Sequence, residues 1–127
     1  MTFRLSKRSL ARLEGVHPDL VAVVHAAIAR TRVDFMITEG RRSLARQKEL
    51  VAAGASRTMN SRHLTGHAVD VAALVGGEVR WDWPLYGVVA EAFKAAAVDL
   101  KTPIIWGGDW PKFRDGPHFE LARKAYP

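Results

Sequence analysis

The stretch that most restricts the possible folds is "HAVDVAALVGGEVRW", residues 67–81. Its side chains alternate in character and are rich in valine, as in a β-strand whose two faces differ. The alternation stops at Gly76 and Gly77 and then resumes with "EVR". A glycine pair between two such runs is typical of a tight hairpin turn, since glycine adopts positive φ angles without strain. The stretch therefore predicts an antiparallel hairpin, and with it a sheet.

The other patterned segments predict three helices and three short strands. Apolar residues recur with the helical period in residues 17–32, 43–54 and 82–98. Short strands are expected at residues 34–38, 103–106 and 117–121. Helices followed by antiparallel strands, with one helix between the strands, favour an α+β fold: a small antiparallel sheet with helices packed mainly on one face.

The length and composition fit one domain. The chain has 127 residues, no internal repeat and no linker-like run rich in proline, glycine or serine, so a single domain is expected over residues 1–127. It contains no cysteine. Disulfides and thiolate metal sites are therefore excluded, and a zinc ion would have to be bound by histidine and carboxylate side chains.

Three groups that can bind a metal lie in "SRHLTGHAVD", residues 61–70. In a helix, His63, His67 and Asp70 would share one face. Gly66 and the alternation that follows it favour a strand instead, in which His67 and Asp70 point to opposite faces. We therefore expect His63, in the preceding loop, to meet Asp70, and His67 to lie outside the site. The alternative is a histidine-rich loop that binds no metal.

A third ligand has to come from elsewhere in the chain. His17 precedes a proline at the start of a helix and suits a cap, whereas His118 begins a strand after a tight turn and suits a cleft. Two histidines and one aspartate leave the fourth tetrahedral position for water, which is typical of catalytic zinc. Asp115, three residues before His118, could then take a proton from that water.

The charge of the chain favours anionic partners. The net charge is +6 and the isoelectric point is about 10.2, which suits nucleic acid, anionic lipid or an anionic cell wall. No common nucleic-acid-binding signature is present, so no nucleic-acid partner is expected. Two basic clusters, over residues 4–12 and 41–48, alternate with apolar positions and are interpreted as solvated helix faces.

No segment resembles a secretory signal or a membrane span. The first 17 residues are basic but are not followed by a continuous apolar run, and no run approaches the roughly 20 apolar residues that cross a bilayer. We therefore expect a product made in the cytoplasm without a signal peptide.

Four segments carry a resemblance to a known family. "SRHLTGHAVD" matches the Ser-x-His-x-x-Gly-x-Ala-x-Asp pattern of the zinc peptidases that include VanY-type D,D-carboxypeptidases and phage L-alanyl-D-glutamate endopeptidases. "DGPHFEL" resembles the second motif of that family, an acidic residue three positions before a histidine. "TEGRRS" is similar to its arginine segment, and "WGGDW" most resembles the phage endolysin branch.

The resemblance implies a set of site residues and a cofactor, Zn²⁺. Asp115 would be the general base, Arg42 would hold a substrate carboxylate or the oxyanion, and Ser61 would support the site by hydrogen bonding. Arg41 stands where many members have an aromatic residue, so which arginine points inward is left open. The zinc ligands would be His63, Asp70 and His118.

The resemblance further implies a phage endolysin, a zinc-dependent hydrolase of peptidoglycan peptide stems. We expect it to cleave the L-alanyl–D-glutamate bond as a monomer, with no separate wall-binding domain, and to bind the anionic envelope through its basic surface. It would reach the wall after release through a holin or similar pore. The alternatives are a D-alanyl-D-alanine carboxypeptidase of the same family and, from another class, a non-catalytic basic binding domain.

Overall fold

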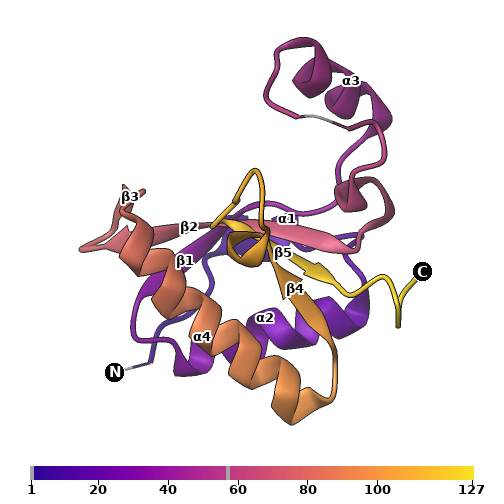
Figure 1. The fold of residues 1–127 in the computed structure, drawn as a ribbon. Helices are drawn as coiled ribbons and strands as arrows, with labels where there is room; N and C mark the ends of the chain where they lie inside the picture. Colours follow the sequence, from indigo (N-terminus) through magenta and orange to yellow (C-terminus); the bar gives the residue numbers. More distant parts are fainter. Residues whose placement is uncertain (1, 57) are drawn as a thin grey trace.

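The computed structural model describes residues 2–56 and 58–127. Figure 1 shows an α+β fold in which a small sheet carries helices mainly on one side, as predicted. The elements, in chain order, are α1 (Lys7–Arg12), α2 (Pro18–Arg30), β1 (Asp34–Glu39), α3 (Leu44–Ala52), the 3₁₀ turn η1 (Arg62–Thr65), β2 (Ala68–Val75), β3 (Glu78–Arg80), α4 (Trp83–Leu100), β4 (Ile104–Trp106), the 3₁₀ turn η2 (Gly107–Asp109) and β5 (His118–Leu121).

The sheet is antiparallel and is built around β2. Its strand order is β1-β2-β5-β4, and β3 pairs with β2. The predicted hairpin is therefore present, with the turn at Gly76 and Gly77, both of which have positive φ angles. Because β2 is long, β3 pairs with its end and β5 with its beginning. This leaves the first half of β2 next to β5, where the site lies.

The hydrophobic core lies between the sheet and two helices. Helices α2 and α4 pack against each other on the same side of the sheet (Figure 1). On β2, Val69 and Val71 face them and are fully buried, together with Phe119 of β5. The side chain of Asp70, between the two valines, therefore points to the opposite face, as the alternation predicted.

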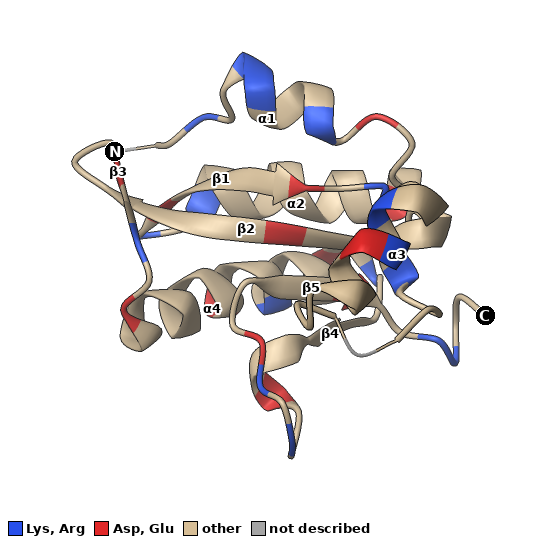
Figure 2. Ribbon diagram, turned by 90° about the horizontal axis from the view of Figure 1, so that it is seen from above, with Lys and Arg blue, Asp and Glu red and all other residues tan. Residues whose placement is uncertain are grey.

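Helix α1 covers the free edge of the sheet. Figure 2 shows α1, with its basic segments, running alongside β1. Ser9 Oγ accepts a hydrogen bond from the Ile37 amide (3.0 Å), and Arg12 Nη1 donates to the Ile37 carbonyl (2.9 Å). Arg12 was expected on a solvated helix face. Instead, it donates a hydrogen bond to an edge strand, whose backbone groups would otherwise be exposed without a partner.

Helix α3 stands apart from the sheet, on the segment that joins β1 to η1 (Figure 1). It begins after Ser43, whose Oγ accepts a hydrogen bond from the Arg46 amide (3.1 Å) and thereby caps the helix. The buried side chain of Gln47 fixes the helix to the chain beyond it, because its amide donates to Ser56 Oγ (2.8 Å) and to the Thr58 carbonyl. The helix thus forms one wall of a cleft.

None of the helices in the described residues combines the length and apolar character needed to cross a bilayer.

Candidate metal centre and cleft

Strand register brings three polar side chains into one row. Glu39 of β1 is the cross-strand partner of Asp70 of β2, and Asp70 is in turn the partner of His118 of β5. Directly paired residues on one face have side chains within contact distance. The row lies on the face opposite α2 and α4, so Asp70 sits between an acidic and an imidazole side chain.

His63 reaches this row from the 3₁₀ turn before β2. Ser61 caps the turn by accepting a hydrogen bond from the His63 amide (3.2 Å), and Gly66 ends it in a left-handed conformation (φ 76°). His63 Nδ1 donates to the Gly40 carbonyl (2.8 Å), which leaves Nε2 facing Asp70 Oδ1 at 3.3 Å. Gly40 has to be glycine, since an added Cβ would lie 2.1 Å from the Arg12 carbonyl oxygen.

His118 is oriented in the same manner as His63, but with the roles of its two ring nitrogens exchanged. Its Nδ1 faces Asp70 Oδ1 at 3.2 Å, while its Nε2 donates to Glu120 Oε1 (2.8 Å). Each imidazole therefore has one nitrogen fixed by a protein acceptor and the other turned towards the same carboxylate oxygen. Metal-binding histidines in proteins are oriented in this manner.

The three groups fit a tetrahedral metal ion. One ligand atom from each of His63, Asp70 and His118 lies within 4.8 Å of the others. Ligands about 2.0–2.1 Å from a tetrahedral zinc ion are about 3.3 Å apart, which agrees with the 3.2 and 3.3 Å that separate Asp70 from the two rings. His67 lies outside the group, as predicted: its ring contacts Thr65 and His17 instead.

The electrostatics of the group also favour a bound cation. Burial alone would raise the pKa of Asp70, but hydrogen bonds from His118 and His63 outweigh it and lower that pKa well below its ordinary value. Burial alone would lower the pKa of His118, but hydrogen bonds to Asp70 and Glu120 raise it to about 9. Two carboxylates thus stabilise positive charge on His118, and a metal ion would supply such a charge in place of the proton.

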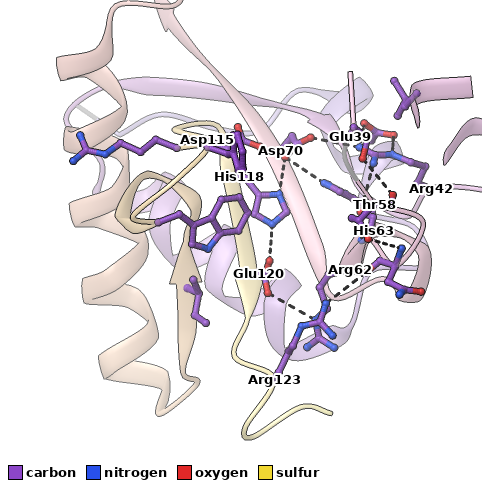
Figure 3. A pocket seen from close by; sticks show the side chains of 18 of the residues that line it. Glu39, Arg42, Thr58, Arg62, His63, Asp70, Asp115, His118, Glu120 and Arg123 are labelled. Carbon is purple, nitrogen blue, oxygen red and sulfur yellow. Dashed lines mark hydrogen bonds and ion pairs between the residues drawn. The ribbon is translucent and has the colours of Figure 1, made fainter. Parts of the chain in front are cut away.

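Asp115 lies beside this group on the turn before β5 (Figure 3). The turn is closed by hydrogen bonds from the Asp115 amide to the Gly107 carbonyl (3.0 Å) and from the His118 amide to the Asp115 carbonyl (3.2 Å). Burial and the charge of Asp70 raise the pKa of Asp115, against the opposing effect of His118. Asp109, in the 3₁₀ turn η2, is instead paired with Lys94 (2.7 Å).

Of the two adjacent arginines, Arg42 points inward and Arg41 is exposed. The Arg42 guanidinium is 9% exposed and donates to both oxygens of Glu39, at 2.6 and 2.7 Å, and to Gln47 Oε1 at 2.6 Å. Its Nη2 also lies 3.8 Å from Asp70 Oδ2. Arg42 thereby connects the α3 arm to the row across the sheet.

Sequence reasoning missed Glu39, Gln47 and Glu120. A signal existed for Glu120, because residues two apart in a strand share a face, and His118 was already placed in one. Glu39 and Gln47 gave no such signal, since their roles depend on strand register and on where α3 lies.

The group opens into a cleft of about 1040 Å³. One wall comes from the α3 arm, the second from the loop over residues 110–115, and the third from the chain that follows β5. Ser61, Arg42 and Asp115 all line it. An extended peptide could therefore approach the metal group from solvent.

Comparisons with known proteins identify a family. The family described as Phage L-alanyl-D-glutamate peptidase matches residues 1–122. The L-alanyl-D-glutamate peptidase of Escherichia phage T5 is 32% identical over 99% of this chain and 94% of its own length. The peptidoglycan L-alanyl-D-glutamate endopeptidase CwlK of Bacillus subtilis is 32% identical over 76% of this chain and 65% of its own. The crystal structure of the L-Ala D-Glu endopeptidase ChiX of Serratia marcescens superposes with a TM-score of 0.93, at 48% identity, covering 98% of this chain and 94% of that one.

Proposed function

Because the chain belongs to the phage L-alanyl-D-glutamate peptidase family, we propose that it hydrolyses the L-alanyl–D-glutamate bond in the peptide stems of bacterial peptidoglycan. The observation that carries the proposal is the convergence of His63, Asp70 and His118 on one point of an open cleft, with Asp115 beside them. A binding module would need neither the fixed imidazole nitrogens nor the adjacent carboxylate.

The three converging residues are the proposed ligands of Zn²⁺. Their donor set, two imidazoles and one carboxylate, suits zinc and is the kind found where zinc is catalytic. Zinc in such a site lowers the pKa of a water molecule to about 7 and polarises a carbonyl group. Three protein ligands leave room for one further group from the cleft.

Asp115 is the proposed general base. Its carboxylate can accept a proton from the attacking water and return the proton to the leaving amine, which would be expelled only slowly without it. Its position supports this role, because the turn before β5 holds Asp115 beside the proposed zinc ligands.

Arg42 and Ser61 are the proposed substrate-supporting residues. The Nη2 of Arg42 lies on the side of Asp70, so its remaining N–H is placed to stabilise negative charge that develops at the reacting carbonyl. Ser61 caps the turn that carries His63 and accepts a weak hydrogen bond from Arg42 (3.5 Å). Ser61 would keep the side chains of His63 and Arg42 correctly placed relative to each other.

The setting of the reaction is part of the proposal. The enzyme would act as a monomer with one catalytic domain over residues 1–127, and as a phage endolysin it would reach the wall after release from the cytoplasm. Its net charge of +6 would favour the anionic envelope.

Digestion of purified peptidoglycan by the zinc-loaded protein, followed by mass spectrometry of the released fragments, tests the function. We expect free peptides that begin with D-glutamate and glycan chains that end their stems at L-alanine. Release of free D-alanine would instead indicate a carboxypeptidase. Binding of the wall without any released peptide would indicate a non-catalytic domain.

A further inference from the structure

Two basic side chains line the cleft where the chain leaves β5, Arg123 and Lys124. Within residues 2–56 and 58–127, neither forms an ion pair; Arg123 makes only a long hydrogen bond to the Asn60 carbonyl (3.5 Å). Figure 2 shows the basic character of the chain between β5 and the C-terminus.

Three of the four carboxylates that line the cleft cannot neutralise these cations, because they are already engaged; the fourth, Asp115, lies at the opposite end of the labelled residues from Arg123. Glu39 is paired with Arg42, and Asp70 with the two histidines. Glu120 accepts from His118 and lies 3.9 Å from Arg62 Nε. The described part of the cleft therefore keeps unbalanced positive charge on the wall that bears Arg123 and Lys124.

This charge lies to one side of the reacting centre. In Figure 3, Asp115 and Arg123 are at opposite ends of the labelled residues, with His118 and Glu120 between them. Arg123 is also close enough to the buried Arg62 for their charges to repel. Arg114, by contrast, lies over the ring of Trp83 (5.9 Å) and contributes little to this end of the cleft.

Arg42 cannot bind a carboxylate further along the cleft, because most of its N–H groups are already used. Glu39 and Gln47 take three of its five N–H groups, and a fourth is directed to Ser61. The fifth N–H group, on Nη2, faces Asp70 and the reacting centre. Any carboxylate bound further along the cleft has to be held by other cations.

The chemistry of the proposed substrate supplies such carboxylates on one side only. An L-alanyl–D-glutamate bond uses the amino group of glutamate, so neither of its two carboxyl groups takes part in the bond. One continues the stem and the other stays free. On the other side, alanine offers only a methyl group. An anionic fragment therefore leaves on the glutamate side.

We propose that Arg123 and Lys124 form a subsite for the free carboxylates of the stem on the glutamate side of the cleaved bond. This inference rests on the proposed function. The subsite fixes the direction of the peptide in the cleft: the carboxylates of glutamate lie towards Arg123, while the amine of glutamate stays at the reacting centre beside Asp115. It also makes the enzyme sensitive to amidation of the stem, since a carboxamide carries no charge.

The test compares two synthetic stems that differ only at the free glutamate carboxyl group, which is a carboxylate in one and a carboxamide in the other. We expect Arg123→Ala to raise KM for the carboxylate stem by about tenfold or more, as for the loss of a charge-assisted hydrogen bond. The effect on kcat should be small, and Lys124→Ala should act in the same direction. KM for the carboxamide stem should be higher in the parent and nearly unchanged by the substitutions.

Two charge-matched controls on α1, Arg8→Ala and Lys7→Ala, remove the same charges from exposed positions outside the cleft. They should leave both KM values unchanged, and Arg123→Lys should restore part of the loss. Zinc content and the melting temperature confirm that each variant is folded.

The outcomes separate the two proposals. If the parent cleaves the stem but does not distinguish carboxylate from carboxamide, or if Arg123→Ala and Lys124→Ala both keep the parental KM, the subsite is wrong and the function stands. If the controls raise KM as much as the cleft variants do, the effect is one of net charge and the subsite is again wrong. If the parent cleaves neither stem, the proposed function fails and this inference fails with it.

Discussion

Glu120 Oε1 accepts a hydrogen bond from His118 Nε2 at 2.8 Å, and the two residues share one face of β5. Both residues are buried, Glu120 with 8% and His118 with 6% of the residue surface exposed. The bond fixes which ring nitrogen of His118 is turned to Asp70. On the far side of Glu120, Arg62 donates to the carbonyls of Leu121 (3.1 Å) and Tyr126 (2.6 Å), so the chain after β5 is tied to the site.

Loss of this acceptor should weaken zinc binding. We expect Glu120→Ala to lower zinc affinity by about 10–100-fold, because partners that orient a ligand histidine typically contribute that much. Glu120→Gln should lose less, since its amide oxygen can still accept from Nε2. Titration against a chelator of known affinity measures the change. Parental affinity in Glu120→Ala would show that the bond does not orient the ligand.

Alanine substitutions should distinguish the three proposed zinc ligands from the neighbouring His67. His63→Ala, Asp70→Ala and His118→Ala should each lose tight zinc binding, because each removes one of three protein ligands. His67→Ala should keep full zinc content, since its ring contacts Thr65 and His17 instead. Metal analysis after dialysis provides the measurement. Zinc loss in His67→Ala together with retention in Asp70→Ala would overturn the assignment.

Asp115→Asn should separate catalysis from metal binding. The substitution is nearly isosteric and keeps hydrogen bonding, but an amide cannot accept the proton. We expect full zinc content and a loss of at least about a hundredfold in turnover, within the range for a general acid–base group. Zinc content and peptide release are measured on one preparation. Activity near the parental level would assign the base to another group.

Zinc binding should depend on pH through His118. In the metal-free protein the pKa of His118 is raised to about 9, so at neutral pH its Nδ1 has to release a proton before it can bind a metal. Apparent zinc affinity should therefore rise with pH, by about tenfold per unit for this one proton, and level off above about pH 9. Calorimetry in buffers of different ionisation enthalpy counts the protons. Binding without proton release at pH 7 would contradict the expectation.

Substitution of Arg42 should affect activity and stability far more than substitution of Arg41. Arg42→Ala should reduce activity with zinc retained, and it should also destabilise the fold by roughly 1–3 kcal/mol, because Glu39 and buried Gln47 would lose their donor. Arg42→Lys should restore only part, since an ammonium group lacks the two-pronged geometry. Arg41→Ala is the matched control and should be close to silent. Thermal unfolding and peptide release report the two effects, and the reverse pattern would show that Arg41 is the functional residue.

The sequence by itself determined the local framework. The alternation around Asp70 and the glycine pair at 76 and 77 predicted the hairpin and which β2 residues face the helices. The same alternation separated His67 from Asp70. Local patterns are sufficient here because the two-residue period of a strand and the conformational demands of a turn are properties of neighbouring residues.

Only the tertiary structure decided how distant residues meet. The choice of Arg42 over Arg41 follows from where Glu39 and Gln47 lie, and the row of Glu39, Asp70 and His118 follows from the register of three strands. The cations at the far end of the cleft also became recognisable only once the nearby carboxylates were seen to be engaged. Such pairings depend on which segments pack together, and no periodicity within a segment reports the position of a partner brought close by folding.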